Sequence, residues 1–160
     1  MTYAAPLADM RFVLEEVAGL DGIAQLPGYE PASPDLVEAI LGEAGKLAEG
    51  VLAPLNQPAD RIGSVLENGV VRTPPGCREA YARYVEGGWN GLAGDAEYGG
   101  QGLPLALATP VIEMWNSACM SFALSRCSIW ALWSCCSRMA RPSRSGFISA
   151  SSSPGNGPGR

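Results

Sequence analysis

Few side chains in this sequence are of the types that commonly carry out catalysis. There is no histidine, which excludes His-based catalytic triads, histidine general bases and most zinc sites. Two carboxylates, Glu97 and Glu113, lie in the stretch richest in sequence signals. We expect Glu113 to face solvent or to pair with a neighbour and Glu97 to precede a turn, so neither is assigned as a base. The sequence therefore predicts no catalytic residue.

Cysteine is the other residue type that could bind a metal or act as a nucleophile. The sequence has five, an odd number, and their spacing is not that of metal ligands, so we predict reduced thiols and no metal site. They are Cys77, Cys119, Cys127, Cys135 and Cys136.

The most distinctive stretch runs from Glu86 to Pro104 and reads EGGWNGLAGDAEYGGQGLP. It holds seven glycines around Trp89 and Tyr98. Because glycine enters positive φ without steric cost, this composition predicts tight turns around two aromatic rings. By spacing alone the stretch is a loop between two helices.

Two helices are predicted before residue 55. The first, over residues 6–20, is short and amphipathic. The second has Ser33 as its cap and Pro34 in its first position, and a broad apolar face that should end at Ala53 and Pro54. The apolar face of the first helix consists of Met10, Val13, Leu14 and Val17.

A hairpin is predicted between this long helix and the next one. Residues 56–63 are polar and turn-rich, and residues 64–73 have strand-like patterning. Asn68 and Gly69 supply the two positive-φ positions of a tight hairpin turn.

Helices are also predicted on both sides of the glycine-rich loop. The first opens at Pro75, carries Tyr81 and Tyr84 in its apolar stripe and ends at the Gly-Gly pair 87–88. The second begins at Pro104. Aromatic residues at helical spacing are usually core residues, and we read both tyrosines in this way.

The loop resembles a segment of the acyl-CoA dehydrogenases, of the form GW-x-GL…P-E-x-GG-x-GL, which leads into a helix that helps to enclose the acyl chain. Ala96 stands where proline is usual. Similar to the same family are the runs APLADMRFVLEEV, EAGKLAEGVLAPLN and EMWNSACMSFAL, so the resemblance covers about residues 3–124. The residues that match the loop pattern are Trp89, Gly91, Leu92, Glu97, Tyr98, Gly99, Gly100, Gly102 and Leu103.

This resemblance implies an all-α fold class, the N-terminal helical domain of the acyl-CoA dehydrogenase fold with a small hairpin. It divides the chain into three parts. Residues 1–32 would be an N-terminal extension with a short helix, as in one bacterial subgroup, and residues 33–124 the helical domain. Residues 125–160 would be an irregular, low-complexity tail.

The resemblance also implies a reaction for a full-length parent. In the family, FAD lies between a middle β-barrel and a C-terminal helical bundle. A glutamate removes the α-proton of an acyl-CoA thioester while a hydride leaves the β-carbon for the flavin. Electrons then pass to an electron-transfer flavoprotein, and a homo-oligomer is expected.

Little of that machinery can be carried over to this chain. None of its residues matches the family's catalytic glutamate, flavin-binding motifs or CoA-contacting residues, so the fragment should be inactive and should not bind FAD tightly. What the resemblance gives is a set of candidate substrate-pocket residues, for each of which simple packing is an equally good interpretation. They are Tyr98, Gly99, Gly100, Gly102, Met120, Ala123 and Leu124.

The charge distribution changes abruptly near residue 124. Residues 1–124 carry 6 of the 11 basic residues and all 16 acidic ones, a net charge of −10, whereas residues 125–160 carry five arginines and no acid. A formal net charge of −5 without a basic stripe argues against a nucleic-acid partner. The N-terminus lacks both a basic and an apolar leader region, so we predict a soluble cytoplasmic protein without a membrane partner.

Residues 125–160 have three interpretations. A membrane segment needs about 20 mostly apolar residues, and Arg126 with several serines and cysteines interrupts the apolar run. A disordered basic tail could bind an acidic partner. The third interpretation, which we favour, is a reading-frame error.

The frameshift can be tested on paper. Sliding the frame back by one nucleotide from Trp133 onward, with permitted codons, restores VVLLAHGTPEQKRVYLGKLVSGEWAGT. This peptide resembles the family's next segment, a helix ending LLAHG followed by EEQK-x-x-YLPKL-x-SGEW-x-GT. A continuous match of this length is hard to obtain from codon degeneracy alone.

Two other functions stay open at the level of sequence. One is a small helical interaction module whose basic tail docks on a partner. The other is a fragment of an acyl-CoA oxidase, since oxidases share the N-terminal architecture and differ mainly in oxygen access and electron disposal.

Overall fold

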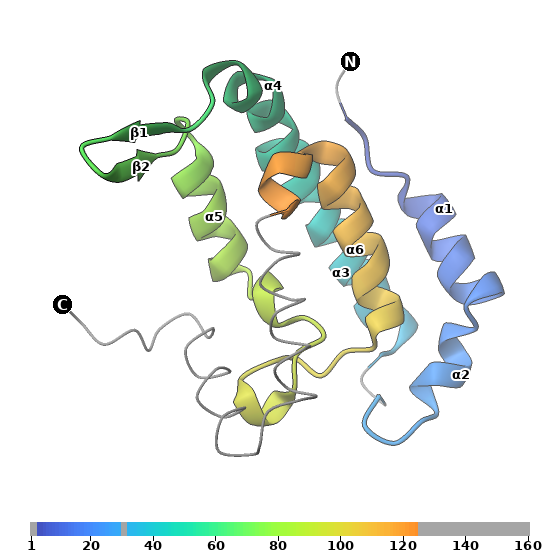
Figure 1. The fold of residues 1–160 in the computed structure, drawn as a ribbon. Coiled ribbons are helices and arrows are strands. Elements are labelled where there is room, and N and C mark those ends of the chain that lie inside the picture. The colour runs from blue at the N-terminus through green and yellow to red at the C-terminus, as the bar shows by residue number, and fades with distance from the viewer. Residues whose placement is uncertain (1–2, 30–31, 125–160) are drawn as a thin grey trace.

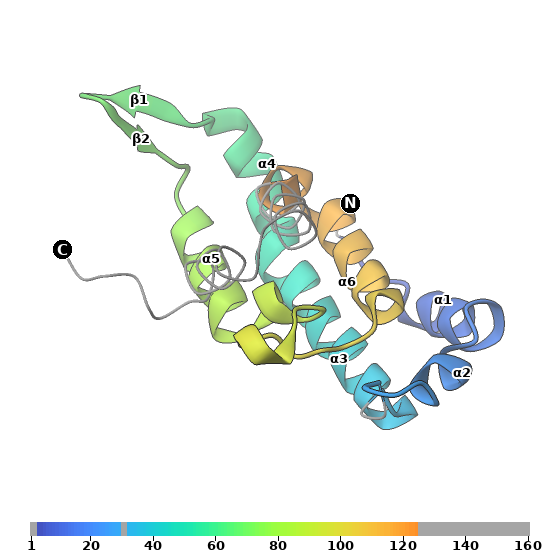
Figure 2. The ribbon, with the colours of Figure 1, turned by 60° about the horizontal axis from the view of Figure 1, so that its bottom comes forward.

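The computed structural model describes residues 3–29 and 32–124. Within them the chain is mostly helical with a single two-stranded hairpin, as the predicted fold class requires of that part. Helices α3 and α6 run side by side at the centre, with α1 and α2 on one side of the pair and α5 on the other (Figures 1 and 2). The elements are α1 (Leu7–Phe12), the π-helical turn η1 (Val13–Val17), α2 (Leu20–Ala24), α3 (Pro34–Leu47), the π-helical turn η2 (Ala48–Leu52), α4 (Ala53–Ile62), β1 (Val65–Glu67), β2 (Val70–Arg72), α5 (Cys77–Glu86), the 3-10 turns η3 (Trp89–Gly91) and η4 (Ala96–Tyr98), and α6 (Leu105–Ala118).

The helix expected over residues 6–20 is only partly α-helical. After α1 the chain widens into η1, and Gly19 ends it with a left-handed φ of 63°. Met10 and Leu14 are buried, as predicted, but Val13 and Val17 are exposed, so half of the predicted apolar face is wrong. A π-helical turn has more residues per turn than an α-helix, which rotates later residues away from the stripe that α-helical spacing predicts.

The segment before α1 packs against η2. The backbone N–H of Ala5 donates to Glu49 Oε1 at 2.8 Å. The Tyr3 hydroxyl is buried and has no hydrogen-bond partner among the described residues. Burial, with smaller contributions from the carboxylates of Glu113 and Glu49, raises the pKa of Tyr3 above its ordinary value of 10.0.

We expect Tyr3→Phe to raise the free energy of unfolding by about 1 kcal/mol, because it removes a buried hydroxyl without a partner. The raised pKa means that the folded state holds the phenolic proton more tightly than the unfolded chain. Its contribution to stability is complete below pH 10.0 and is lost as the pH rises through the folded-state pKa. Urea titrations at neutral and alkaline pH should show a smaller alkaline loss in the variant. Tyr81→Phe, at an exposed tyrosine, is the control. It should change neither the free energy of unfolding at neutral pH nor the size of the alkaline loss.

Helix α3 begins as the sequence predicts. Ser33 is its cap, with Oγ accepting from the Leu36 N–H at 3.4 Å, and Pro34 occupies its first turn.

Ser33→Ala is expected to lower the free energy of unfolding by about 1 kcal/mol, because the Leu36 N–H loses its acceptor. Chemical denaturation measures this. Ser64→Ala, at an exposed serine that caps no helix, should be close to neutral, and an equal loss in both variants would contradict the capping role.

The predicted end of the long helix at Ala53 and Pro54 is wrong. The chain passes through η2, in which the N–H of Ala53 donates to Ala48 O, and continues as α4 to Ile62. Residues 56–62, for which turns were predicted, are therefore helical, and Gly63 follows the end of the helix. Pro54 is tolerated because it lies in the first turn of α4, where a backbone N–H is not needed.

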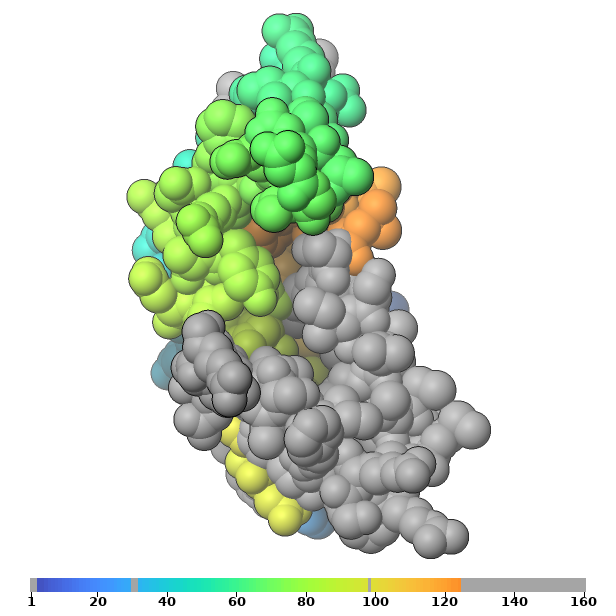
Figure 3. Space-filling model, turned by 60° about the vertical axis from the view of Figure 1, so that its left-hand side comes forward, coloured from blue at the N-terminus to red at the C-terminus, as the bar shows by residue number. Residues whose placement is uncertain are grey.

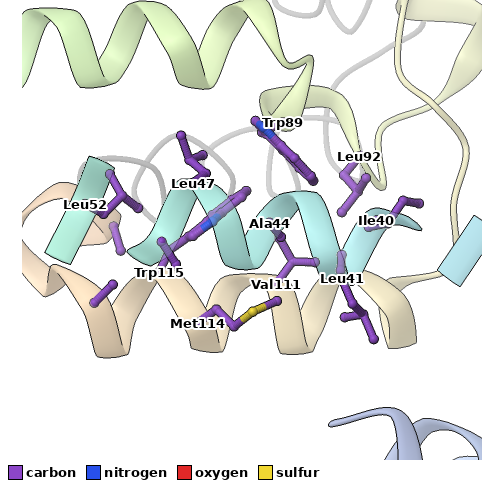
Figure 4. Packing of buried hydrophobic residues seen from close by; sticks show 14 of the residues in the cluster. Ile40, Leu41, Ala44, Leu47, Leu52, Trp89, Leu92, Val111, Met114 and Trp115 are labelled. Atoms are coloured by element: carbon purple, nitrogen blue, oxygen red, sulfur yellow. The ribbon is translucent and has the colours of Figure 1, made fainter. Parts of the chain in front are cut away.

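The core lies between the central helices and the loop that precedes α6. Figure 4 shows Trp115 of α6 and Trp89 of that loop beside buried residues of α3, among them Ala44 and Leu47. The predicted broad face of α3 is confirmed by its buried members, which are Val37, Ile40, Leu41, Ala44 and Leu47.

The predicted hairpin is confirmed and extends away from the helices (Figure 1). Strands β1 and β2 pair antiparallel, with Glu67 opposite Val70 across the turn. The next helix, α5, starts at Cys77 after the left-handed Gly76, two residues later than predicted. On α5, Tyr84 is buried as predicted, whereas Tyr81 is exposed and stacks on it with ring centroids 6.1 Å apart.

Candidate functional site

The glycine-rich loop folds back on itself through backbone hydrogen bonds. The N–H of Gln101 donates to Gly91 O at 2.8 Å, and that of Gly102 to Gly94 O at 2.8 Å. The N–H of Leu103 donates to Leu92 O at 3.1 Å. Residues 91–94 and 101–103 therefore lie against each other without forming a regular strand pair, which is the compact turn structure that seven glycines predict.

Close backbone contact explains one of the candidate glycines. A Cβ placed on Gly100 would lie 2.2 Å from both C and O of Gly94, so no other residue fits there without moving the backbone. Gly99 and Gly102 have left-handed φ values of 84° and 65°. These three candidate glycines thus have conformational reasons for being glycine.

Two side chains brace the loop. Gln101 Nε2 donates to Gly88 O at 3.1 Å, and Asp95 Oδ1 accepts from the Glu97 N–H at 2.9 Å at the start of η4. The backbone of Tyr98, the remaining candidate of this loop, ends η4.

The other three candidates lie in a helical turn after α6. Met120 and Leu124 are 58% and 55% exposed, whereas Ala123 is buried and its N–H donates to Cys119 O at 3.1 Å. Ala123 packs in the core, while the two larger side chains are more than half exposed.

The two groups of candidates lie at opposite ends of α6 (Figures 1 and 2). The loop precedes α6 and the Met120 turn follows it, and a helix of 14 residues is about 21 Å long. A small ligand cannot touch both groups. Together they could line only an extended cavity.

An aromatic cluster that residue spacing did not predict lies beside the loop. The rings of Trp89 and Tyr84 both meet Trp115 edge to face, at centroid distances of 5.5 and 5.3 Å. A Cβ on Gly87 would lie 2.3 Å from Trp89 Nε1, so the indole ring packs over this glycine. The sequence signal for this contact was the run Gly87, Gly88 and Trp89, but the run alone does not show which aromatic ring packs on Gly87.

Neither carboxylate in this region is arranged as a base. Glu97 and Glu113 are both exposed, in agreement with the expectation that Glu113 faces solvent. Burial, with smaller contributions from Cys119 and Glu79, raises the pKa of the Cys77 thiol. A raised pKa disfavours the thiolate, so Cys77 is not an activated nucleophile.

A shallow groove of about 320 Å³ lies between η2, α4 and α5. Its walls include Val51, Pro54 and Leu55, with Glu79 and Arg83 of α5 among the polar lining residues. None of the candidate residues lines it. A dinucleotide cofactor needs a deeper cleft with several convergent polar groups, so these described residues do not fit a flavin, and we assign no chemical step to them.

None of the helices within residues 3–29 and 32–124 is both long enough and apolar enough to cross a membrane.

Comparison with known proteins gives one informative similarity. No family model matches the chain. It is 39% identical over 124 residues to the 3-methylmercaptopropionyl-CoA dehydrogenase of Ruegeria pomeroyi. The match covers 78% of this chain but only 21% of that protein, so the chain spans about a fifth of the length of its relative. This similarity confirms the resemblance seen in the sequence, and the chain is thereby identified as a relative of the acyl-CoA dehydrogenases that matches a limited part of one member.

Proposed function

We propose that residues 33–124 are the N-terminal helical domain of a flavin-dependent acyl-CoA dehydrogenase, with residues 1–32 as an N-terminal extension. The observation that carries this proposal is the 39% identity over most of the chain to the 3-methylmercaptopropionyl-CoA dehydrogenase described above. The mostly helical fold and the loop that folds back before α6 are compatible with it.

The activity belongs to a full-length parent in this proposal. The parent oxidises an acyl-CoA thioester to the 2-enoyl-CoA with FAD as hydride acceptor, passes electrons to an electron-transfer flavoprotein and acts as a cytoplasmic homo-oligomer. This chain contributes the shape of the cavity mouth through Tyr98, Gly99, Gly100 and Gly102. It contributes part of the acyl-tail wall through the turn at 120–124.

The chain by itself should be inactive. Purified protein is mixed with FAD, an acyl-CoA and an artificial electron acceptor. The flavin is expected to elute separately from the protein on gel filtration, and no enoyl-CoA absorbance is expected to form. A full-length relative assayed in parallel is the positive control. Flavin that co-elutes with the chain, or turnover above the buffer blank, would overturn this part of the proposal.

The tail at residues 125–160 lies outside the described residues, and we propose that it arises from a frameshift. Resequencing the DNA over codons 120–165 and beyond, with all three frames read, tests this. A one-base change that restores the HGTPEQK…SGEWAGT segment and continues into flavin-binding and catalytic motifs would support it. A correct frame with no dehydrogenase-like sequence downstream would contradict the enzyme proposal for this gene.

The full-length protein translated in the corrected reading frame would allow its acyl-CoA substrate to be identified. The relative's name gives 3-methylmercaptopropionyl-CoA, a thioester with a short sulfur-containing acyl group. Comparing kcat/KM for this compound and for straight-chain acyl-CoAs would assign the acyl class. Hydrogen peroxide formation without an added electron acceptor would favour the oxidase alternative over the dehydrogenase.

The second candidate function, a helical interaction module with a basic tail, is favoured by one observation. Residues 125–160 carry five arginines and no acid, against a net charge of −10 in the rest of the chain. If the reading frame proves correct, salt-sensitive binding of the purified chain to an acidic protein, lost when the five arginines become glutamine, would support this function.

A further inference from the structure

Three Asn-Gly dipeptides occur in this chain, at residues 68–69, 90–91 and 156–157, and the structure describes the first two. Asparagine followed by glycine is prone to cyclise, because glycine has no side chain to shield its backbone nitrogen. Whether the reaction occurs in a folded protein depends on how firmly that nitrogen is held. The two described copies differ sharply in this respect.

Asn68 and Gly69 form the tip of the hairpin. Their φ values of 51° and 79° are those of a turn with two left-handed central residues, and Asn68 is the one described non-glycine residue with positive φ. In such a turn the closing hydrogen bond joins the flanking residues, which leaves the amide of Gly69 facing solvent. A Cβ on Gly69 would meet nothing within 4 Å.

The strands that hold this turn are short and exposed. Strands β1 and β2 have three residues each, and all six are exposed. In Figure 3 the green hairpin region lies at one end of the molecule. An isolated two-stranded hairpin is marginally stable in water, so local opening should cost little compared with global unfolding.

The backbone of Gly91 is held by hydrogen bonds in the second dipeptide, although the Asn90 side chain is exposed. The N–H of Gly91 donates to Gly88 O at 3.2 Å, and its carbonyl accepts from Gly94 N at 3.0 Å and Gln101 N at 2.8 Å. A Cβ on Gly91 would lie 3.3 Å from the Cα of Gly100. The dipeptide also sits between two buried residues, Trp89 and Leu92, so its opening requires disruption of the core.

We propose that Asn68 is a site of spontaneous deamidation in the folded protein and that Asn90 is protected. The deprotonated backbone nitrogen of Gly69 attacks the side-chain carbonyl carbon of Asn68. A carbon–nitrogen bond forms, the bond to the side-chain nitrogen breaks, and ammonia leaves. Water then opens the cyclic imide at either carbonyl to give aspartate or isoaspartate, with no change of oxidation state.

The product would change the hairpin. Isoaspartate routes the main chain through the side-chain carbon and adds one backbone atom to a turn that has room for only two residues. The pairing of Glu67 with Val70 across the turn would be lost. The new carboxylate would also lie beside Glu67, which pairs with Arg72 in the unmodified hairpin.

The test follows both sites in the full chain. The purified protein is incubated at mildly alkaline pH, in native buffer and in concentrated guanidinium chloride, and is sampled over days. Trypsin cuts after Arg61 and Arg72, so Asn68 is read from peptide 62–72, and Asn90 from peptide 84–126. Mass spectrometry measures the replacement of NH₂ by OH, and enzymatic methylation of isoaspartyl carboxylates identifies the isomer. Asn68→Gly keeps a turn that accepts two positive-φ residues and removes the reactive side chain.

Denaturant makes the two sites equivalent, so both should react there at similar rates. In native buffer we expect Asn68 to retain at least about ten times more of its denatured-state rate than Asn90 does, because its opening is local. The modified 62–72 peptide should be absent from Asn68→Gly. Equal protection of both sites, faster reaction at Asn90 than at Asn68 in native buffer, or an Asn90 rate that is the same in buffer and in denaturant would each overturn the proposal.

Discussion

Trp115→Ala is expected to lower the free energy of unfolding by about 3–5 kcal/mol, the cost of truncating a large aromatic residue in a packed core. Trp115 is 1% exposed, and its ring meets those of Tyr84 and Trp89 edge to face. These two partners come from α5 and from the loop before α6, so the substitution would remove the contact that joins three parts of the fold. Urea denaturation followed by far-UV circular dichroism measures the loss.

Leu105→Ala is the matched control on the same helix. Leu105 is half exposed in the first turn of α6, and leucine and alanine both favour helix, so the variant should stay within about 0.5 kcal/mol of the parent chain. A Trp115→Ala loss below about 1 kcal/mol would show that the aromatic cluster is not a cooperative part of the core.

Gly100→Ala is expected to lower the free energy of unfolding by about 3 kcal/mol, at the upper end of the usual range for single substitutions. The new Cβ would overlap the backbone of Gly94, and backbone cannot move aside as a flexible side chain can. Relief would require separation of residues 91–94 from 101–103 and loss of hydrogen bonds such as Gln101 N to Gly91 O. Hydrogen exchange should therefore show faster exchange at Gln101 and Gly102 in the variant.

Gly42→Ala provides the opposite control. Gly42 lies within α3, and a Cβ there meets nothing within 4 Å, so the substitution should raise the free energy of unfolding by about 0.5–1 kcal/mol. If Gly100→Ala were as neutral or as stabilising as Gly42→Ala, the close approach of Gly100 to Gly94 would not exist in solution.

Local chemistry was sufficient to predict the features that depend on a few neighbouring residues. A cap at Ser33 needs only a side-chain oxygen three residues before a free N–H, and a tight hairpin turn needs only Asn68 and Gly69. The start of α6 after Pro104 is of the same kind. The resemblance to acyl-CoA dehydrogenases was also available from the sequence, because it rests on the order of residues in the glycine-rich loop.

The candidate site could be predicted only in part. The loop glycines were identified from their pattern, but their reasons differ: positive φ at Gly99 and Gly102, and contact with Gly94 at Gly100. The separation of the loop from Met120 and Leu124 by the length of α6 became evident only with the helix in place.

The sequence alone determined the helical class of this chain, its caps and turns, and its kinship with the acyl-CoA dehydrogenases, because these are written in short runs of neighbouring residues. Tertiary structure decided which side chains meet. The helix continues past Pro54 to Ile62 because η2 places the proline where no N–H is required. Trp115 receives two aromatic partners, and Gly100 meets Gly94, because the chain folds back at the loop. Such contacts depend on the three-dimensional path of the backbone, which the spacing of residues along the chain does not specify.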